Sequence, residues 1–103
     1  LPWFEKAIAV LRPLYQSEPR DVLTRRYLKN SHTSRAVALD LLRRHAEAVA
    51  DWDQVVELTA KAEQPNGRLM RAVSRALAGQ LPEAVAEAAE LWPMGWDGGS
   101  WYD

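Results

Sequence analysis

The chain is 103 residues long, with 48% hydrophobic and 26% charged residues and a formal net charge of −1. These values are ordinary for one globular domain and exclude an intrinsically disordered chain. The absence of cysteine excludes disulfides and cysteine-ligated zinc, the near-zero net charge gives no support to nucleic-acid binding, and no apolar run approaches the roughly 20 residues that a membrane-spanning helix needs.

Helical periodicity dominates the first half of the chain. The stretch "FEKAIAVLR" at 4–12 is predicted as a helix, although Pro13 follows inside it and is expected to kink or split it at a cost of roughly 3 kcal/mol. After the break "SEPR" at 17–20, Asp21 is placed to cap a second helix. The polar stretch "NSHTS" at 30–34 is expected to separate that helix from a third one.

Three more helices are predicted in the second half. The first begins at His45, where only the repeat described below indicates a break. The stretch "QPNG" at 64–67 is expected to be the loop before the next helix, which Gly79 should end because glycine readily adopts the left-handed conformation. Pro82 suits the first turn of the last helix. The sequence therefore predicts six helices joined by short turns, and no strand.

One phrase opens three of these helices: "FEKAI" at 4–8, "HAEAV" at 45–49 and "LPEAV" at 81–85. The alanine in each copy would let a neighbouring helix approach closely, and the other apolar residues recur on the same helix face. The helix after "QPNG" has a similar apolar stripe. We expect these faces to form the packing contacts, through Phe4, Ala7, Ile8, Leu11, Leu14, His45, Ala48, Val49, Trp52, Val55, Leu69, Ala72, Ala76, Leu81, Ala84, Val85, Ala88 and Leu91.

The repeated phrase resembles the second helix of a tetratricopeptide repeat, in which a helix pair turns at a glycine and closes near a proline. Gly79 stands where the family's turn glycine would be, and the longer stretch "LLRRHAEAVADWDQVVEL" is similar to arrays found beside bacterial serine/threonine kinase domains. The resemblance implies an all-α fold, a tetratricopeptide-like right-handed α–α superhelix of about three stacked hairpins. It would occupy residues 1–93 and precede an aromatic, glycine-rich tail at 94–103. Another helical hairpin array or a bundle is the alternative.

The chain departs from the family pattern at several places. The alanines of the three copies are 41 and 36 residues apart, whereas the family repeats every 34 or so residues. Arg43 replaces the turn glycine of the middle copy, and Pro13 is foreign to the pattern. The first copy has no partner helix upstream, which leads us to expect a trimmed N-terminus.

No motif indicates catalysis, a metal or a cofactor. The two histidines, His32 and His45, have no acidic or histidine neighbours at metal-ligand spacing, and we expect His32 to be solvated in a polar turn. Glu83 and Glu87 lie one helical turn apart and are interpreted as an exposed acidic face. No P-loop, dinucleotide fingerprint or nucleophile elbow occurs. We therefore predict a protein that is not an enzyme and needs no cofactor.

Candidate interface residues come from a basic segment and from the tail: Arg25, Arg26, Arg43, Arg44, Trp96, Trp101 and Tyr102. The arginines flank apolar stripes, which favours solvated helix faces over nucleic-acid contacts. The tail aromatics are expected either to cap the last helix pair or to dock on another chain.

Three functions fit this architecture. The first is a non-catalytic protein–protein interaction module that binds a protein or peptide partner. The second is a structural subunit that self-associates, with further copies of the chain stacking end to end into an oligomer or filament. The third is a helical segment excised from a larger enzyme such as a protein kinase.

Overall fold

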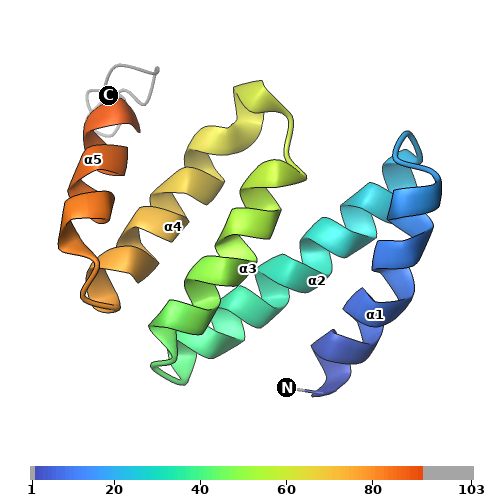
Figure 1. Cartoon of the computed structure of the whole chain (residues 1–103), viewed down its shortest axis with the longest axis horizontal. Helices are drawn as coiled ribbons and strands as arrows, with labels where there is room; N and C mark the ends of the chain where they lie inside the picture. The colour runs from blue at the N-terminus through green and yellow to red at the C-terminus, as the bar shows by residue number, and fades with distance from the viewer. Residues whose placement is uncertain (1, 92–103) are drawn as a thin grey trace, which may run out of the picture.

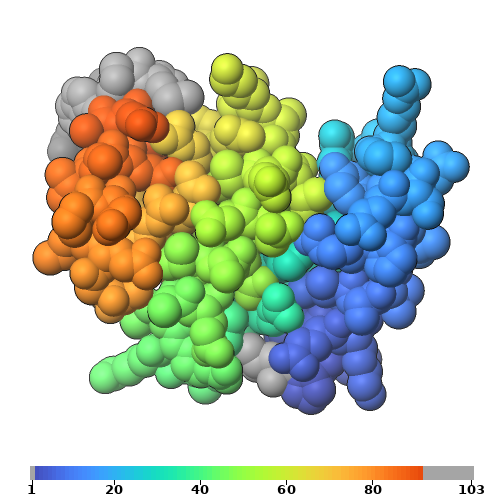
Figure 2. Space-filling model, viewed as in Figure 1, coloured from blue at the N-terminus to red at the C-terminus, as the bar shows by residue number. Residues whose placement is uncertain are grey.

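The computed structural model describes residues 2–91, which form five α-helices, one short 3-10 helix and no strand. The elements are α1 (Pro2–Ser17), α2 (Val22–Leu41), α3 (His45–Glu57), η1 (Lys61–Glu63), α4 (Gln64–Leu77) and α5 (Leu81–Leu91). The α-helices lie in a row in which each packs against the next one along the chain (Figure 1). Most of the face in Figure 2 is formed by α1, α3 and α5, with α2 and α4 visible between them. The all-α prediction is confirmed for these residues.

One helix fewer forms than predicted, because α2 runs unbroken through the expected break at 30–34. That stretch contains no glycine or proline, and two of its polar side chains find partners without leaving the helix. The Thr33 hydroxyl donates to a backbone carbonyl one turn earlier at 2.9 Å, and His32 is buried against α3. Asp21 caps the helix as predicted, since its carboxylate accepts two backbone N–H groups of the first turn.

Pro13 was expected to kink or split α1, and it lies within the helix without splitting it. The proline lacks the N–H that would bond to the carbonyl of Ala9. Both residues are exposed, and water can therefore satisfy that carbonyl.

The predicted loop at 64–67 is instead the first turn of α4. Pro65 is tolerated there because the first turn of a helix does not need its N–H. The chain breaks earlier, between the end of α3 and η1. Gly67 lies where α4 approaches α3, and a Cβ atom on it would meet a methyl group of Val56 at 3.4 Å. A Cβ atom at this position would thus make ordinary van der Waals contact with α3.

The turns of the helix pairs α2–α3 and α4–α5 have the same geometry. Arg43 and Gly79, 36 residues apart, adopt positive φ angles of 61° and 87°. In each turn the N–H of the next residue, Arg44 or Gln80, donates to the carbonyl five residues earlier, at 2.8 or 2.7 Å. This is the hydrogen-bond pattern of a Schellman helix end. Gly79 ends its helix as predicted, and Arg43 adopts the same left-handed conformation despite its side chain.

The hydrophobic core has two clusters. One joins α2 to α3 around Trp52 and comprises Ala36, Leu39, Ala48, Trp52 and Val55. The other lies where α1 meets α2 and the end of α3, and comprises Ile8, Leu28 and Leu58 with Leu11 and Tyr15 against them. Ala48 and Ala84, the alanines of the second and third copies, are both buried. Small side chains at these positions allow the helices to cross closely.

Part of the predicted packing face is exposed instead. The exposed members are Leu14, Ala76, Leu81, Val85 and Ala88. All but one of them lie on α1 or α5, the outermost helices of the row, which have a neighbouring helix on one side only (Figure 1). Ala76 lies on the exposed side of α4. Membership of the repeated apolar face therefore does not by itself determine whether a residue is buried.

Candidate protein-binding groove

The helix pairs α2–α3 and α4–α5 are two copies of one sequence unit. Residues 35–51, "RAVALDLLRRHAEAVAD", and 71–87, "RAVSRALAGQLPEAVAE", share eight of 17 positions at an offset of 36. The match includes "RAV" in α2 and α4, which lies upstream of the phrase that marks α3 and α5. The equivalence therefore covers both helices of each pair, and it allows their side chains to be compared position by position.

In the first pair, a buried carboxylate on α3 holds two basic side chains of α2. Asp51 is only 2% exposed. One of its oxygens lies 2.8 Å from Nδ1 of His32, and the Arg35 guanidinium donates to both oxygens at 2.8 Å. His32 is thus buried and paired, and the expectation that it would be solvated is wrong. It occupies the middle of a continuous helix and faces α3.

The second pair has the same arrangement at the equivalent positions. Glu87 on α5 accepts hydrogen bonds from Nε of Arg68 and Nε of Arg71, both at 3.0 Å, where the first pair has Asp51, His32 and Arg35. Glu87 is 5% exposed, so its interpretation as part of an exposed acidic face is wrong. It faces α4, whereas Glu83, one turn earlier, is exposed.

Both buried carboxylates remain ionised at neutral pH. Burial alone would raise the pKa of Asp51, but the hydrogen bonds from His32 and Arg35 outweigh it and hold that pKa below its ordinary value. Burial likewise raises the pKa of Glu87, but the hydrogen bonds from Arg71 and Arg68 lower it by more, so the net pKa is below its ordinary value. Each helix pair is therefore joined by a charged contact that depends on the ionised carboxylate.

His32 also connects α1 to the first pair. Arg12 donates to Nε2 of His32 at 3.0 Å and to the side-chain oxygen of Gln54 at 2.7 Å. Because a guanidinium can only donate, Nε2 accepts the hydrogen bond from Arg12, and Nδ1 donates to Asp51. The ring is 3% exposed, with both nitrogens occupied, so it serves packing and leaves no free nitrogen for acid–base chemistry.

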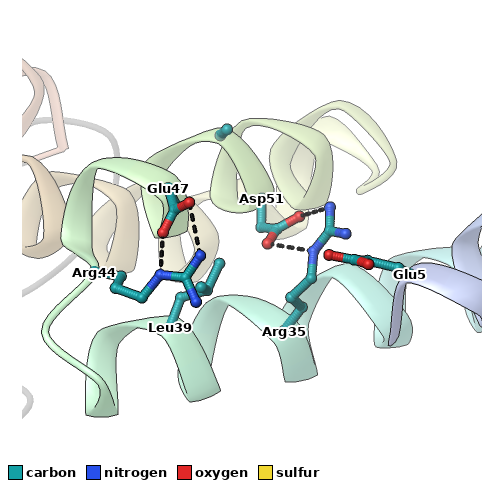
Figure 3. A pocket seen from close by; sticks show the side chains of 7 residues that line it. Glu5, Arg35, Leu39, Arg44, Glu47 and Asp51 are labelled. Carbon is teal, nitrogen blue, oxygen red and sulfur yellow. Dashed lines mark hydrogen bonds and ion pairs between the residues drawn. The ribbon is translucent and has the colours of Figure 1, made fainter. Parts of the chain in front are cut away.

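A charged hollow of about 260 Å³ lies beside this network, between α1, α2 and α3. Figure 2 shows α2 at the base of the space between α1 and α3. Arg35 and Arg44 reach into the hollow, each paired with its own carboxylate, Asp51 or Glu47 (Figure 3). Glu5 of α1 points toward Arg35 from the other side. The positive charges of the hollow are thus already matched by carboxylates of the chain.

Asp40 holds the two helix pairs together. Its carboxylate accepts hydrogen bonds from Nε1 of Trp52 at 3.1 Å and from the hydroxyl of Ser74 on α4 at 2.7 Å, and it lies 2.7 Å from Nδ1 of His45. Burial raises the pKa of Asp40, and the hydrogen bonds from His45, Ser74 and Trp52 more than offset that effect. The hydrogen bond from Ser74 therefore links α4 to α2, and α3 packs against both helices.

An open groove of about 540 Å³ runs between α2 and α4. Asn30 of α2 and Asn66 of α4 both line it, and they are equivalent at the offset of 36. Lys29 and Thr33 line it from the same side as Asn30, and Met70 from the same side as Asn66. Trp52 and Val55 of α3 also contribute. The groove therefore presents amide, hydroxyl and apolar groups to one space.

Two further equivalent pairs follow the asparagines on the same helix faces. Val37 and Leu41 are seven and eleven residues beyond Asn30, and Val73 and Leu77 stand at the same spacings from Asn66, so each set shares one face of its helix. Val37 and Val73 are 44% and 45% exposed, and the leucines are more exposed still. The unit thus repeats apolar side chains that the described fold does not bury. The upstream half of the sequence repeat identifies these exposed apolar side chains. The predicted interface does not include them.

The predicted interface residues lie in different places. Arg25 and Arg26 line a small hollow at the start of α2 together with Lys29 and Glu63, next to the groove. Arg44 is paired with Glu47, and Arg43 lies in the turn close to Leu77. Trp96, Trp101 and Tyr102, and with them the predicted tail at 94–103, lie outside the described residues. The predicted arginines therefore lie at two separate sites, Arg25 and Arg26 at the start of α2 and Arg43 and Arg44 in the turn after it.

Among residues 2–91, no helix is long and apolar enough to cross a membrane, and no group of three or more histidine or acidic side chains could hold a metal ion. No family model, curated protein or solved structure matches the chain. The functional interpretation therefore depends on the groove and on the repeated unit that forms it.

Proposed function

We propose that the chain is a non-catalytic protein-interaction module built from stacked tetratricopeptide-like helix pairs, and that it binds a peptide segment of a partner in the groove between α2 and α4. The observation that supports this most is the repetition of exposed apolar residues, Val37 with Val73 and Leu41 with Leu77. Exposed apolar groups that recur at equivalent positions on one surface suit a binding surface better than isolated exposure does.

The polar chemistry of the chain supports a binding function over a catalytic one. The buried ionisable groups, Asp51, Glu87 and His32, each bond to partners that join helices. Asn30 and Asn66, by contrast, are exposed, and their amide groups can donate to and accept from a peptide backbone. The groove therefore offers both apolar contacts and backbone recognition.

A selection from phage-displayed random 12-residue peptides tests this proposal on the full chain. Selected peptides should bind the double variant Val37→Lys/Val73→Lys at least about tenfold more weakly than the parent protein, because a charge replaces each apolar contact. Val85→Lys is the matched control, since it places the same charge on an exposed valine of α5 outside the groove. Equal binding to the parent and the groove variant would contradict the proposal.

Self-association is the second candidate, and it is favoured by the outer faces of the row. Trp3, Val10 and Leu14 recur at helical spacing on α1 and are exposed, as are Leu81 and Val85 on α5. Two such apolar ends could stack on each other in neighbouring copies. Sedimentation velocity at increasing concentration should then show a rising mass, and Trp3→Glu should return the chain to monomer. A mass that stays monomeric at all concentrations would exclude this candidate.

A further inference from the structure

The surface of α2 and α4 that contains the groove changes in chemistry along these two helices. α2 and α4 run parallel, because each is antiparallel to α3 between them (Figure 1). Their first halves therefore lie at the same end of this surface, where Asn30 and Asn66 line the groove. Their second halves carry the apolar pairs Val37 with Val73 and Leu41 with Leu77. A ligand that lies along these helices would pass from the amide groups of the groove to the apolar surface beyond it.

Positive charge flanks this surface at both ends. Arg26 and Lys29 adjoin the amide end, with Glu63 as the acid beside them, and Arg43 lies close to Leu77 at the apolar end. Within residues 2–91 the ion pairs involve other basic side chains, so Arg26, Lys29 and Arg43 form none, and the nearby Glu47 is paired with Arg44. Their charge is therefore available to a ligand, in contrast to that of Arg35 and Arg44.

We infer that the groove takes an acidic amphipathic α-helix of a partner protein, with apolar residues in its middle and carboxylates in its first and last turns. The inference rests on the proposed function and specifies the partner for that groove. Arg26 and Leu41, the last residue of α2, are 15 residues apart, which corresponds to about 22 Å along the helix axis, and Arg43 follows in the turn. A partner helix of about 18 residues spans that distance, and its diameter of about 10 Å lets it touch the apolar stripes of α2 and α4 together.

Three synthetic peptides of 18 residues test the inference on the full chain. The probe has leucines on one helix face and glutamates in its first and last turns; one control has the same composition in scrambled order, and the other has lysines in place of the glutamates. The probe should bind at least about tenfold more tightly than either control in fluorescence anisotropy. Its advantage over the lysine peptide should decrease in high salt and in Arg26→Glu/Lys29→Glu. Circular dichroism should show that the probe becomes helical when bound.

The phage selection separates a failure of this inference from a failure of the proposed function. Selected peptides that need Val37 and Val73 but lack the acidic amphipathic pattern would overturn the inference and leave the proposed function intact. Selected peptides that bind Val37→Lys/Val73→Lys as well as the parent would overturn both, as would the absence of any binder. Equal affinity for the probe and the lysine peptide would also overturn the inference.

The inference of a partner helix would also be overturned if either of two other occupants fills the groove. A second copy is indicated if the chain is a dimer that Val37→Lys/Val73→Lys dissociates. The chain's own residues 92–103 are indicated if a synthetic peptide of that sequence displaces the bound probe more strongly than a scrambled version does. Neither result is expected if the groove serves a partner helix.

Discussion

Replacing Arg43 by glycine should stabilise the protein. Arg43 has a φ angle of 61°, and the left-handed conformation costs a residue other than glycine about 1–2 kcal/mol. Glycine removes that cost, but it also increases the entropy of the unfolded chain, which offsets about 0.4–1 kcal/mol. Arg43 is exposed and forms no ion pair within residues 2–91, so removal of its side chain should cost little free energy of unfolding. The net expectation is a gain of about 1 kcal/mol.

The equivalent turn supplies the reciprocal experiment. Gly79→Arg should lose about 1 kcal/mol, because nothing lies within 4 Å of a Cβ atom at Gly79 and only the backbone conformation is penalised. Urea unfolding followed by circular dichroism measures both changes, and a gain of about 1 kcal/mol corresponds to roughly 4–8 °C in Tm for a domain near this size. Destabilisation by Arg43→Gly, or a Gly79→Arg variant as stable as the parent, would refute the equivalence of the two turns.

Three further changes in stability are expected. Asp51→Ala should cost about 3 kcal/mol or more in urea unfolding, because it leaves His32 and Arg35 without their shared carboxylate; a variant as stable as the parent would show that the contact contributes nothing. Asp51 and Glu87 have lowered pKa values in the folded protein, so their contribution is complete above their ordinary pKa of about 4 and is lost as the pH falls through the lower folded values. The unfolding free energy measured against pH should therefore decrease below about pH 4, and less steeply in Asp51→Asn. Ala84→Glu should lower the Tm strongly, since it forces volume and charge into a buried helix crossing, whereas Ala86→Glu on the exposed side of α5 should not; equal melting of the two variants would contradict the packing.

The helical character of the chain could be predicted because its apolar periodicity is strong, and the caps at Asp21 and Gly79 follow from local chemistry. The continuity of α2 could not, because "NSHTS" looks like a break when its residues are considered alone. His32 in that stretch belongs to the helix because Asp51 of α3 and Arg12 of α1 complete its hydrogen bonds. Tertiary contacts of this kind override a local polar pattern.

The groove was only partly predictable. The phrase around Ala48 and Ala84 marks the helices that pack, and the interface prediction emphasised the arginines and the tail aromatics. The repeat extends upstream to "RAV" in α2 and α4, and that extension identifies Val37 with Val73 as equivalent exposed residues. Their exposure itself depends on how α2 and α4 are turned against α3, which the spacing alone does not specify.

Backbone amide chemical shifts of the full chain, measured by NMR during titration with a phage-selected peptide, test the assignment of the groove most directly. The largest changes should occur at Asn30, Val37, Asn66 and Val73, on the facing sides of α2 and α4, with little change on the outer faces of α1 and α5. Changes concentrated at Trp3 or Val85 instead would place the binding surface at the ends of the row and contradict the assignment.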